Sequence, residues 1–219
     1  MSDGLKWSGH FKKAETQKEL GYEKIIHTRR NDQKSRFKDY YAKWSGDEQK
    51  RLLEIMEKLI RENSEYADDK NYAHMCNLMT SLAMETALEE RGRTRSEAQE
   101  AVAQAMYEFV EPMIASMQKL AGNSRFVGML KLTMPIKFRH TLGYGWDVEF
   151  PKCGSGKFTM ITHKCIYQQI FSKYGMPEMT AIFCQVDDIL YSELPRAEFI
   201  YTQQIGRGGS MCDYTFKKR

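Results

Sequence analysis

Residues 194–216, LPRAEFIYTQQIGRGGSMCDYTF, place strand-forming residues on both sides of a glycine-rich segment. That segment, GRGGS at 206–210, lets the backbone visit positive φ and reverse its direction. We therefore predict a terminal β-hairpin. Alternation along its second strand places Cys212 and Tyr214 on one face and Asp213 on the other.

Two further strands and two helices are predicted upstream of this hairpin. Alternating residues favour strands at 146–150 and 157–163, and helical spacing favours helices at 165–174 and 178–191. With the hairpin, the order becomes β-β-α-α-β-β. We expect an α+β fold: an N-terminal helical part packed with a C-terminal four-stranded antiparallel sheet that carries the two helices on one face.

The first half of the chain has helical periodicity. Apolar stripes predict helices over 45–66, 71–91 and 94–121. Ser45 and Asp47 are both suitable N-caps for the first, and Thr94–Glu97 offers a capping box for the third. Pro112 is expected to kink or interrupt the third helix, and Pro135 to break a fourth helical segment over 126–141. The buried stripe expected for the third helix comprises Ala98, Val102, Ala105, Met106, Phe109, Met113, Met117 and Leu120.

Texture divides the chain into three parts. Residues 1–44 form a basic arm with interleaved aromatics, residues 45–142 the helical part, and residues 143–219 the α+β part that carries the candidate site. The last two are equally compatible with one continuous domain. The arm resembles a nucleic-acid-binding segment superficially, but its acidic residues dilute the charge, so packing on the body or on another subunit is favoured.

Composition excludes several classes of protein. The net charge of +4 is too mild to indicate nucleic-acid binding, and no stretch of about 18 apolar residues predicts a membrane span. The sequence has five cysteines and no secretory signal, which argues against a disulfide framework and favours the cytoplasm. No CxxC pair indicates structural zinc.

Three thiols and three carboxylates gather in the second half of the chain. The thiols belong to Cys165, Cys184 and Cys212, and the carboxylates to Asp187, Asp188 and Asp213. Together they could form a nucleophile with acid–base partners, or ligate a soft metal. The third interpretation is that all three cysteines are small buried hydrophobes, the commonest fate of a free cysteine.

The arrangement of these residues resembles the L-2-amino-thiazoline-4-carboxylic acid hydrolase family. A cysteine at a helix start, Cys165, is followed by Cys184-x-x-Asp187 on a helix. A glycine turn then leads into Cys212-Asp213. The ending matches the family's Gly-x-x-x-Cys-Asp-Phe pattern at Gly208, Cys212 and Asp213, with Tyr214 in place of Phe. The layout covers about residues 75–216, and only the last 55 or so carry recognisable motifs.

The resemblance implies a hydrolase that opens a small heterocyclic ring at a C–N bond. Its substrate would be a cyclic amidine such as a 2-amino-thiazoline carboxylate, converted to N-carbamoyl-cysteine, or a related lactam or imide. It implies no cofactor, and it leaves a metal bound by Cys, Asp or His open. Our hypothesis for the site takes Cys212, Asp213, Asp187 and Cys184 as catalytic residues. It takes Arg196 or Arg139 as the partner of the substrate carboxylate, with Cys165, His163 and Tyr214 as further substrate-binding residues.

A different function is compatible with the same ending. Small-molecule-binding domains that resemble the vinyl reductase family also end in a Gly-x-x-x-Cys pattern, and there the chain would bind a small molecule or tetrapyrrole without catalysis. Nucleic-acid binding through the arm ranks last. We expect a small-molecule substrate and no membrane partner, and we leave homo-oligomer formation open.

Overall fold

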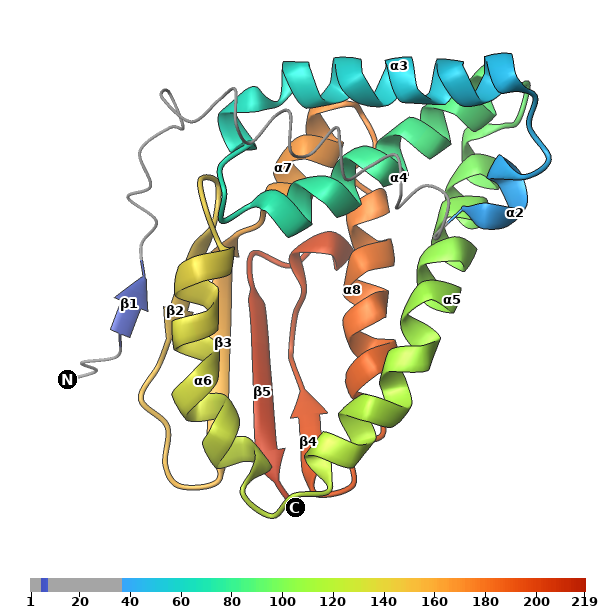
Figure 1. Ribbon diagram of the computed structural model, residues 1–219. Coiled ribbons are helices and arrows are strands. Elements are labelled where there is room, and N and C mark those ends of the chain that lie inside the picture. The colour runs from blue at the N-terminus through green and yellow to red at the C-terminus, as the bar shows by residue number, and fades with distance from the viewer. Residues whose placement is uncertain (1–4, 8–36) are drawn as a thin grey trace. The chain divides into compact units, whose positions relative to one another are not determined.

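The computed structural model describes residues 5–7 and 37–219 (Figure 1). Contacts divide the chain into two compact units, Phe11–Phe109, here the helical unit, and Met1–His10 with Val110–Arg219, here the sheet unit. The division falls inside α5 (Arg95–Ala121). The texture boundary near residue 142 stays a prediction, and most of the basic arm lies outside the described residues.

Two helices of the helical unit begin at capping residues that can be recognised in the sequence. The unit contains α2 (Lys38–Tyr41), α3 (Gly46–Glu62), the 3₁₀ helix η1 (Ser64–Tyr66), α4 (Tyr72–Glu90) and the first half of α5. Before α3, the Ser45 N–H donates to Glu48 Oε2 at 2.7 Å, and the Glu48 N–H donates back to Ser45 Oγ at 3.3 Å. Thr94 and Glu97 form the same reciprocal pair before α5.

The expected break at Pro135 is wrong, because α6 (Phe126–Thr141) continues through this residue. α5 also continues through Pro112, so the expected interruption does not occur there, and a kink at Pro112 stays a prediction. The helix α6 is held on both sides of its proline, because Phe126 is buried before it and Phe138 stacks on Phe150 after it, with ring centroids 5.9 Å apart. Such packing outweighs the loss of one backbone hydrogen bond.

The buried face of α5 also differs from the expected one in its last turns. Met113 is 42% exposed and Leu120 is 47% exposed, although both were predicted to be buried. Val110 and Ala121 are buried instead. The apolar stripe of α5 therefore follows a different line along its second half, which belongs to the sheet unit.

The sheet confirms the predicted β-β-α-α-β-β order and its four antiparallel strands. These are β2 (Asp147–Phe150), β3 (Lys157–Lys164), β4 (Ala197–Ile200) and β5 (Cys212–Lys218), with α7 (Ile166–Lys173) and α8 (Met179–Tyr191) between β3 and β4. A short strand from the start of the chain, β1 (Leu5–Trp7), adds a fifth, which gives the order β1-β2-β3-β5-β4.

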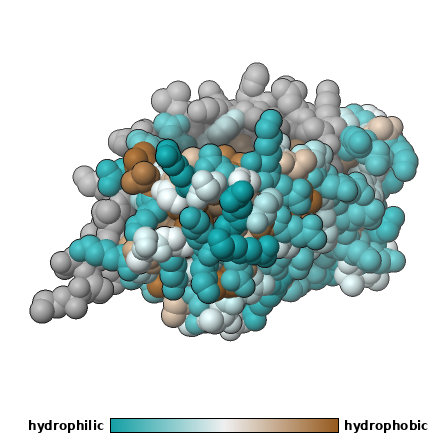
Figure 2. Space-filling model, turned by 90° about the horizontal axis from the view of Figure 1, so that it is seen from below, coloured by the Kyte–Doolittle hydropathy of each residue, from teal (hydrophilic) through white to brown (hydrophobic). Residues whose placement is uncertain are grey.

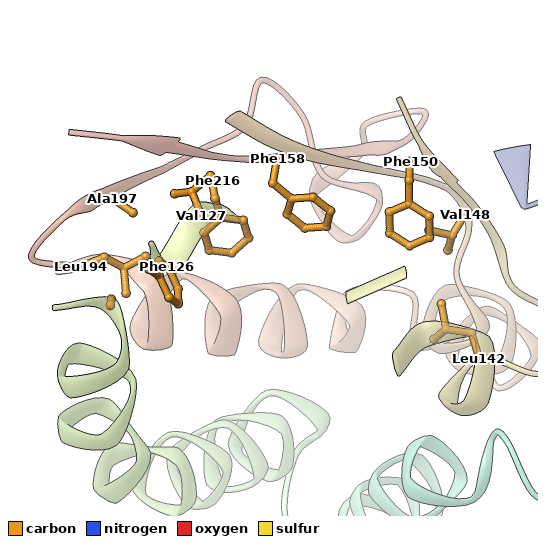
Figure 3. Packing of buried hydrophobic residues seen from close by; sticks show 10 residues of the cluster. Phe126, Val127, Leu142, Val148, Phe150, Phe158, Leu194, Ala197 and Phe216 are labelled. Atoms are coloured by element: carbon orange, nitrogen blue, oxygen red, sulfur yellow. The ribbon is translucent and has the colours of Figure 1, made fainter. Parts of the chain in front are cut away.

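One face of this sheet carries the apolar core of the sheet unit. The register pairs Phe158 with Phe216, and Thr162 with Cys212. Figure 3 shows Phe150, Phe158 and Phe216 along the sheet, with Phe126 facing them. Neighbouring rings are 6.1 Å apart between Phe150 and Phe158, and 6.3 Å apart between Phe158 and Phe216. Aromatic burial of this kind fixes the strand register.

The face shown in Figure 2 is covered mainly by hydrophilic residues, with smaller hydrophobic areas between them. No helix in the described part of the chain has the length and apolar character needed to span a bilayer.

Candidate active site

One face of α8 supplies two of the site's side chains. Cys184, Asp187 and Tyr191 recur at helical spacing and share this face. Tyr191 packs on the sheet, with its ring 5.1 Å from Phe216 and 5.2 Å from Phe199 between centroids. Because Tyr191 fixes the direction of this face, Cys184 and Asp187 are also turned toward the sheet.

The first residues of β5 supply the opposing groups. Cys212 and Tyr214 lie on the same sheet face as Phe216, as the alternation predicts, and all three are buried. The Tyr214 hydroxyl is hydrogen-bonded with the Asp187 carboxylate and interacts with the Cys212 thiol. The site therefore forms where α8 crosses the start of β5.

The 3₁₀ helix η2 (Ile205–Arg207) directs two consecutive backbone amides at the thiols. The Ile205 N–H donates to Cys212 Sγ at 3.3 Å, and the Gly206 N–H donates to the Cys184 sulfur. An added Cβ at Gly206 would come within 2.8 Å of Cys184 Sγ and 2.8 Å of the Thr180 carbonyl carbon. Only glycine permits this close approach, which gives Gly206 a role that the turn prediction did not anticipate.

Cys165 completes the group of thiols from the start of α7. It is the N-cap residue of that helix, and the nearby backbone N–H groups of Tyr167 and Gln168 act to lower its pKa. Burial raises its pKa to about 12, and electrostatic interaction with Cys212 and Cys184 adds to the effect. Cys165 is therefore a neutral thiol at physiological pH.

The other two thiols are neutral as well. Burial raises the pKa of Cys184 to about 11, and the nearby Cys212 and Asp187 add to this. Burial also raises the pKa of Cys212, and this effect outweighs the opposite influence of the Ile205 N–H and the Tyr214 hydroxyl. A thiolate nucleophile at this site thus needs a base that removes its proton as it reacts.

Asp187 has the properties of that base. Its carboxyl group is partly buried, and desolvation raises its pKa from an ordinary 3.8 to about 7, although the Tyr214 hydrogen bond acts in the opposite direction. A carboxyl group that titrates near neutrality can accept and return a proton at physiological pH. Burial raises the pKa of Tyr214, so its hydroxyl keeps its proton.

A network that sequence reasoning missed supports Tyr214 from behind. The Gln204 side chain, 2% exposed, donates from Nε2 to the Tyr214 hydroxyl at 3.0 Å and accepts at Oε1 from Arg207 Nη1. No local motif marks a glutamine in a loop for such a role. The guanidinium of Arg207 also donates to the side chains of Tyr201 at 2.7 Å, Gln185 at 2.7 Å and Asp188 at 2.6 Å.

Asp213 lies outside this cluster, on the opposite face of β5. Its Oδ1 accepts the Thr202 N–H at 2.8 Å and the Gln203 N–H at 3.0 Å, and its Oδ2 accepts the Thr202 hydroxyl. Desolvation is unfavourable here, but these hydrogen bonds outweigh it and lower the pKa of Asp213. The carboxylate holds the loop before η2, and Asp187 is the acid that the structure brings to the thiols.

Three other predicted site residues are placed elsewhere. His163 lies on the sheet face opposite Cys212, with Nε2 3.3 Å from Glu149 Oε2. Arg196 precedes β4 at the end where Ala197 pairs with Lys218, far along β5 from Cys212. Arg139 is an exposed residue of α6. The structure brings together Cys165, Cys184, Asp187, Cys212 and Tyr214.

A metal site was the open alternative for these residues. Within residues 5–7 and 37–219, no group of three or more His, Cys, Asp or Glu side chains is arranged to hold a metal ion. A cavity of about 530 Å³ occurs in the helical unit, between α2 and the first half of α5, and none of the cluster residues lines it.

The geometry defines an α+β protein with a thiol, tyrosine and carboxyl cluster at one end of an antiparallel sheet. The chain belongs to the L-2-amino-thiazoline-4-carboxylic acid hydrolase family, whose model matches residues 70–216, more than half of its length. This match confirms the resemblance found in the sequence. All five cluster residues lie inside the matched segment.

Comparisons with individual proteins add little. No curated protein matches this chain. Two crystal structures of an Fe(II) unliganded H-NOX protein from K. algicida, one of them a mutant, are 11% and 12% identical to it and cover 91% and 89% of it. Both alignments include 95% of the H-NOX chain, with a TM-score of 0.33. That score is too low to establish a common fold, and no argument rests on it.

Proposed function

We propose that this protein is a hydrolase that opens a small cyclic amidine, with a 2-amino-thiazoline carboxylate as the representative substrate. One observation carries the proposal. Asp187, with a pKa of about 7, is hydrogen-bonded with Tyr214 beside the Cys212 thiol, inside the segment that matches the family. This is the combination of nucleophile and base that covalent catalysis on an amidine carbon requires.

In the first half of the proposed reaction, Cys212 is the nucleophile. Its sulfur forms a bond to the amidine carbon of the ring, while its proton passes to the Asp187 carboxylate. Protonated Asp187 then gives that proton to the ring sulfur as the bond between this sulfur and the amidine carbon breaks. The substrate is now joined to Cys212 through its amidine carbon, and Asp187 is ionised again.

In the second half, water replaces the enzyme's sulfur. Asp187 takes a proton from the water as its oxygen bonds to the amidine carbon, and it returns this proton to Cys212 as that sulfur leaves. The water's second proton moves from its oxygen to the former ring nitrogen, so the carbon keeps both nitrogens and becomes a carbamoyl group. For the thiazoline, the ring therefore opens at its C–S bond, and opening at a C–N bond applies to the lactam or imide alternatives.

Neutral groups around the nucleophile favour this sequence of steps. Cys184 and Cys165 keep their protons because burial raises their pKa values, so neither adds a negative charge beside Cys212. The amides of Ile205 and Gly206 point at Cys212 and Cys184, where partial positive charge stabilises a sulfur that loses its proton. We assign Cys165 and Cys184 to the wall of the substrate site.

The test is a mass-spectrometric assay of the purified protein with L-2-amino-thiazoline-4-carboxylate and related cyclic amidines. We expect a product heavier by one water, which Cys212→Ser abolishes. Cys153→Ser is the matched control, because Cys153 lies in the β2–β3 turn with its thiol 3.4 Å from the Pro151 carbonyl oxygen. It should leave turnover unchanged.

Two results would contradict the proposal in different ways. Full turnover by Cys212→Ser would remove the covalent role of Cys212 and leave Asp187 activating water directly. No turnover of any of these rings by the wild-type protein would overturn the hydrolase assignment for this substrate class and favour binding of a small molecule without catalysis.

A further inference from the structure

We propose that Gln204 and Arg207 are positioning residues that force the Tyr214 hydroxyl to donate its hydrogen bond to Asp187. The inference deepens the proposed function and rests on it for the importance of Asp187 as the base. The direction of each hydrogen bond in the network, from Arg207 inward to Tyr214, determines where the Tyr214 proton points.

The first step fixes the orientation of the Gln204 amide. An arginine side chain has N–H donors and no acceptor, so the atom of Gln204 that faces Arg207 Nη1 must be the carbonyl oxygen Oε1. The amide nitrogen Nε2 then faces the Tyr214 hydroxyl, at 3.0 Å. An amide that is often ambiguous in its orientation has only one here.

The second step fixes the direction of the Tyr214 hydroxyl. Because Gln204 Nε2 donates to the Tyr214 oxygen, the tyrosine's own proton must point elsewhere, toward Asp187 or Cys212. An ionised carboxylate is a much stronger acceptor than a thiol. Tyr214 therefore donates to Asp187 whenever that group is charged.

The third step connects this direction to the chemistry. Burial disfavours the charged form of Asp187, and the hydrogen bond from Tyr214 stabilises it, so the pKa stays at about 7. Without that donor, Asp187 would hold its proton through the neutral range and could not serve as a base. Arg207 is anchored on α8 by Asp188 and Gln185, so the orientation is set before any substrate arrives.

Gln204→Glu tests the inference with almost no change in shape. The new carboxylate still accepts from Arg207, but it cannot donate to Tyr214, and the tyrosine proton turns toward it. Asp187 then loses its donor and gains a negative neighbour. We expect the Asp187 titration midpoint to rise by about one unit or more, measured by carbon-13 NMR of labelled Asp carboxyl groups and assigned with Asp187→Asn.

Gln203→Glu is the matched control, one residue away with the same change in charge. Gln203 uses only its Oε1, which accepts from the Ser210 N–H at 2.9 Å and the Ser210 hydroxyl at 3.1 Å, so glutamate keeps both bonds. It should leave the Asp187 midpoint close to the wild-type value. In an active enzyme, the acid limb of the kcat/KM pH profile should move with Gln204→Glu and not with Gln203→Glu.

Tyr214→Phe provides a second variant that adds no charge. It removes the donor itself, so the Asp187 midpoint should again rise. Equal shifts from the two glutamate variants, or an unchanged midpoint in Tyr214→Phe, would overturn the inference. The NMR titration needs no substrate, so a failure of the proposed hydrolase activity would leave this test intact and would be recognised separately.

Discussion

One face of the sheet contains two regions that differ completely in chemistry, although they share the same elements. Toward the end of β5, Phe216 packs with Phe158 and Phe150, and toward its start, Cys212 and Tyr214 meet Asp187. The helix α8 serves both regions, with Tyr191 in the first and Asp187 in the second. Tyr214 of the reactive cluster and Phe216 of the apolar core are thus only two positions apart on one strand.

The comparison shows that an apolar core can raise the pKa values of reactive groups placed at its edge. The phenylalanine region excludes water and fixes the register of β5 and the contact face of α8. Polar groups placed at its edge are desolvated, and desolvation is the main cause of the raised pKa values of Asp187, Cys184 and Cys212. Stability in the first region is therefore a condition for reactivity in the second.

The largest expected effects come from one substitution in each region, Phe216→Ala in the apolar core and Asp187→Asn in the cluster. Phe216→Ala should lower the free energy of unfolding by about 3–5 kcal/mol, because it empties a buried ring site. Asp187→Asn should instead lower turnover by about 10²–10⁴-fold, the usual contribution of a general base, without loss of stability. Urea unfolding and initial rates on folded protein measure both effects.

The reverse pattern would break the comparison between the regions. A loss of stability in Asp187→Asn comparable with that of Phe216→Ala would make the cluster part of the core. Phe158→Leu, which keeps most of the buried volume, provides a milder variant if Phe216→Ala does not fold. Its turnover per folded molecule should match that of the wild-type protein.

A smaller effect is expected at Gly206 and Gly208, in the loop between β4 and β5. Gly206→Ala brings a Cβ within 2.8 Å of the Thr180 backbone and 2.9 Å of the Ala181 nitrogen, so η2 must move away from α8. Gly208→Ala meets no atom within 4 Å and has only the strain of φ +86, about 1–2 kcal/mol. Thermal unfolding should rank Gly206→Ala as the more damaging, and equal losses would contradict the close-approach argument.

The sequence predicted the elements of this fold wherever the signals were local. The N-cap at Ser45, the capping box at Thr94–Glu97 and the strand alternation around Cys212 depend on neighbours a few residues away, and all were confirmed. The break expected at Pro135 was wrong, because the packing of Phe138 on the distant Phe150 decides whether α6 continues. Local rules do not contain that contact.

The predictions for the candidate site were likewise correct for local relations and incomplete for distant ones. Helical spacing correctly put Cys184 and Asp187 on one face. The site hypothesis also included Asp213 as a catalytic residue, although strand alternation predicted it on the face opposite Cys212. Neighbouring strand residues point to opposite faces, so Asp213 holds the loop through Thr202 and Gln203. Gln204 had no sequence signal, since its role arises only from the hydrogen bonds that η2 brings to Tyr214.

The two carboxyl groups also make opposite contributions to stability as pH changes, and this gives the smallest and most specific prediction. Asp187 has a pKa of about 7 in the folded protein against an ordinary 3.8, so the folded state binds its proton more tightly than the unfolded state does. Its favourable contribution is complete below about pH 4 and is lost as pH rises toward 7. The pKa of Asp213 is lowered, so its contribution is present above its ordinary value and is lost only in stronger acid.

The measurement that isolates Asp187 is the difference in unfolding free energy between the wild-type protein and Asp187→Asn. Between about pH 4.5 and about pH 7.5, the unfolding free energy of the wild-type protein minus that of Asp187→Asn should fall steadily. The contributions of the other titrating groups cancel in this difference. A difference that rises over this range would mean that the folded protein stabilises the Asp187 carboxylate. In that case desolvation at the edge of the phenylalanine core would not control the chemistry of the site.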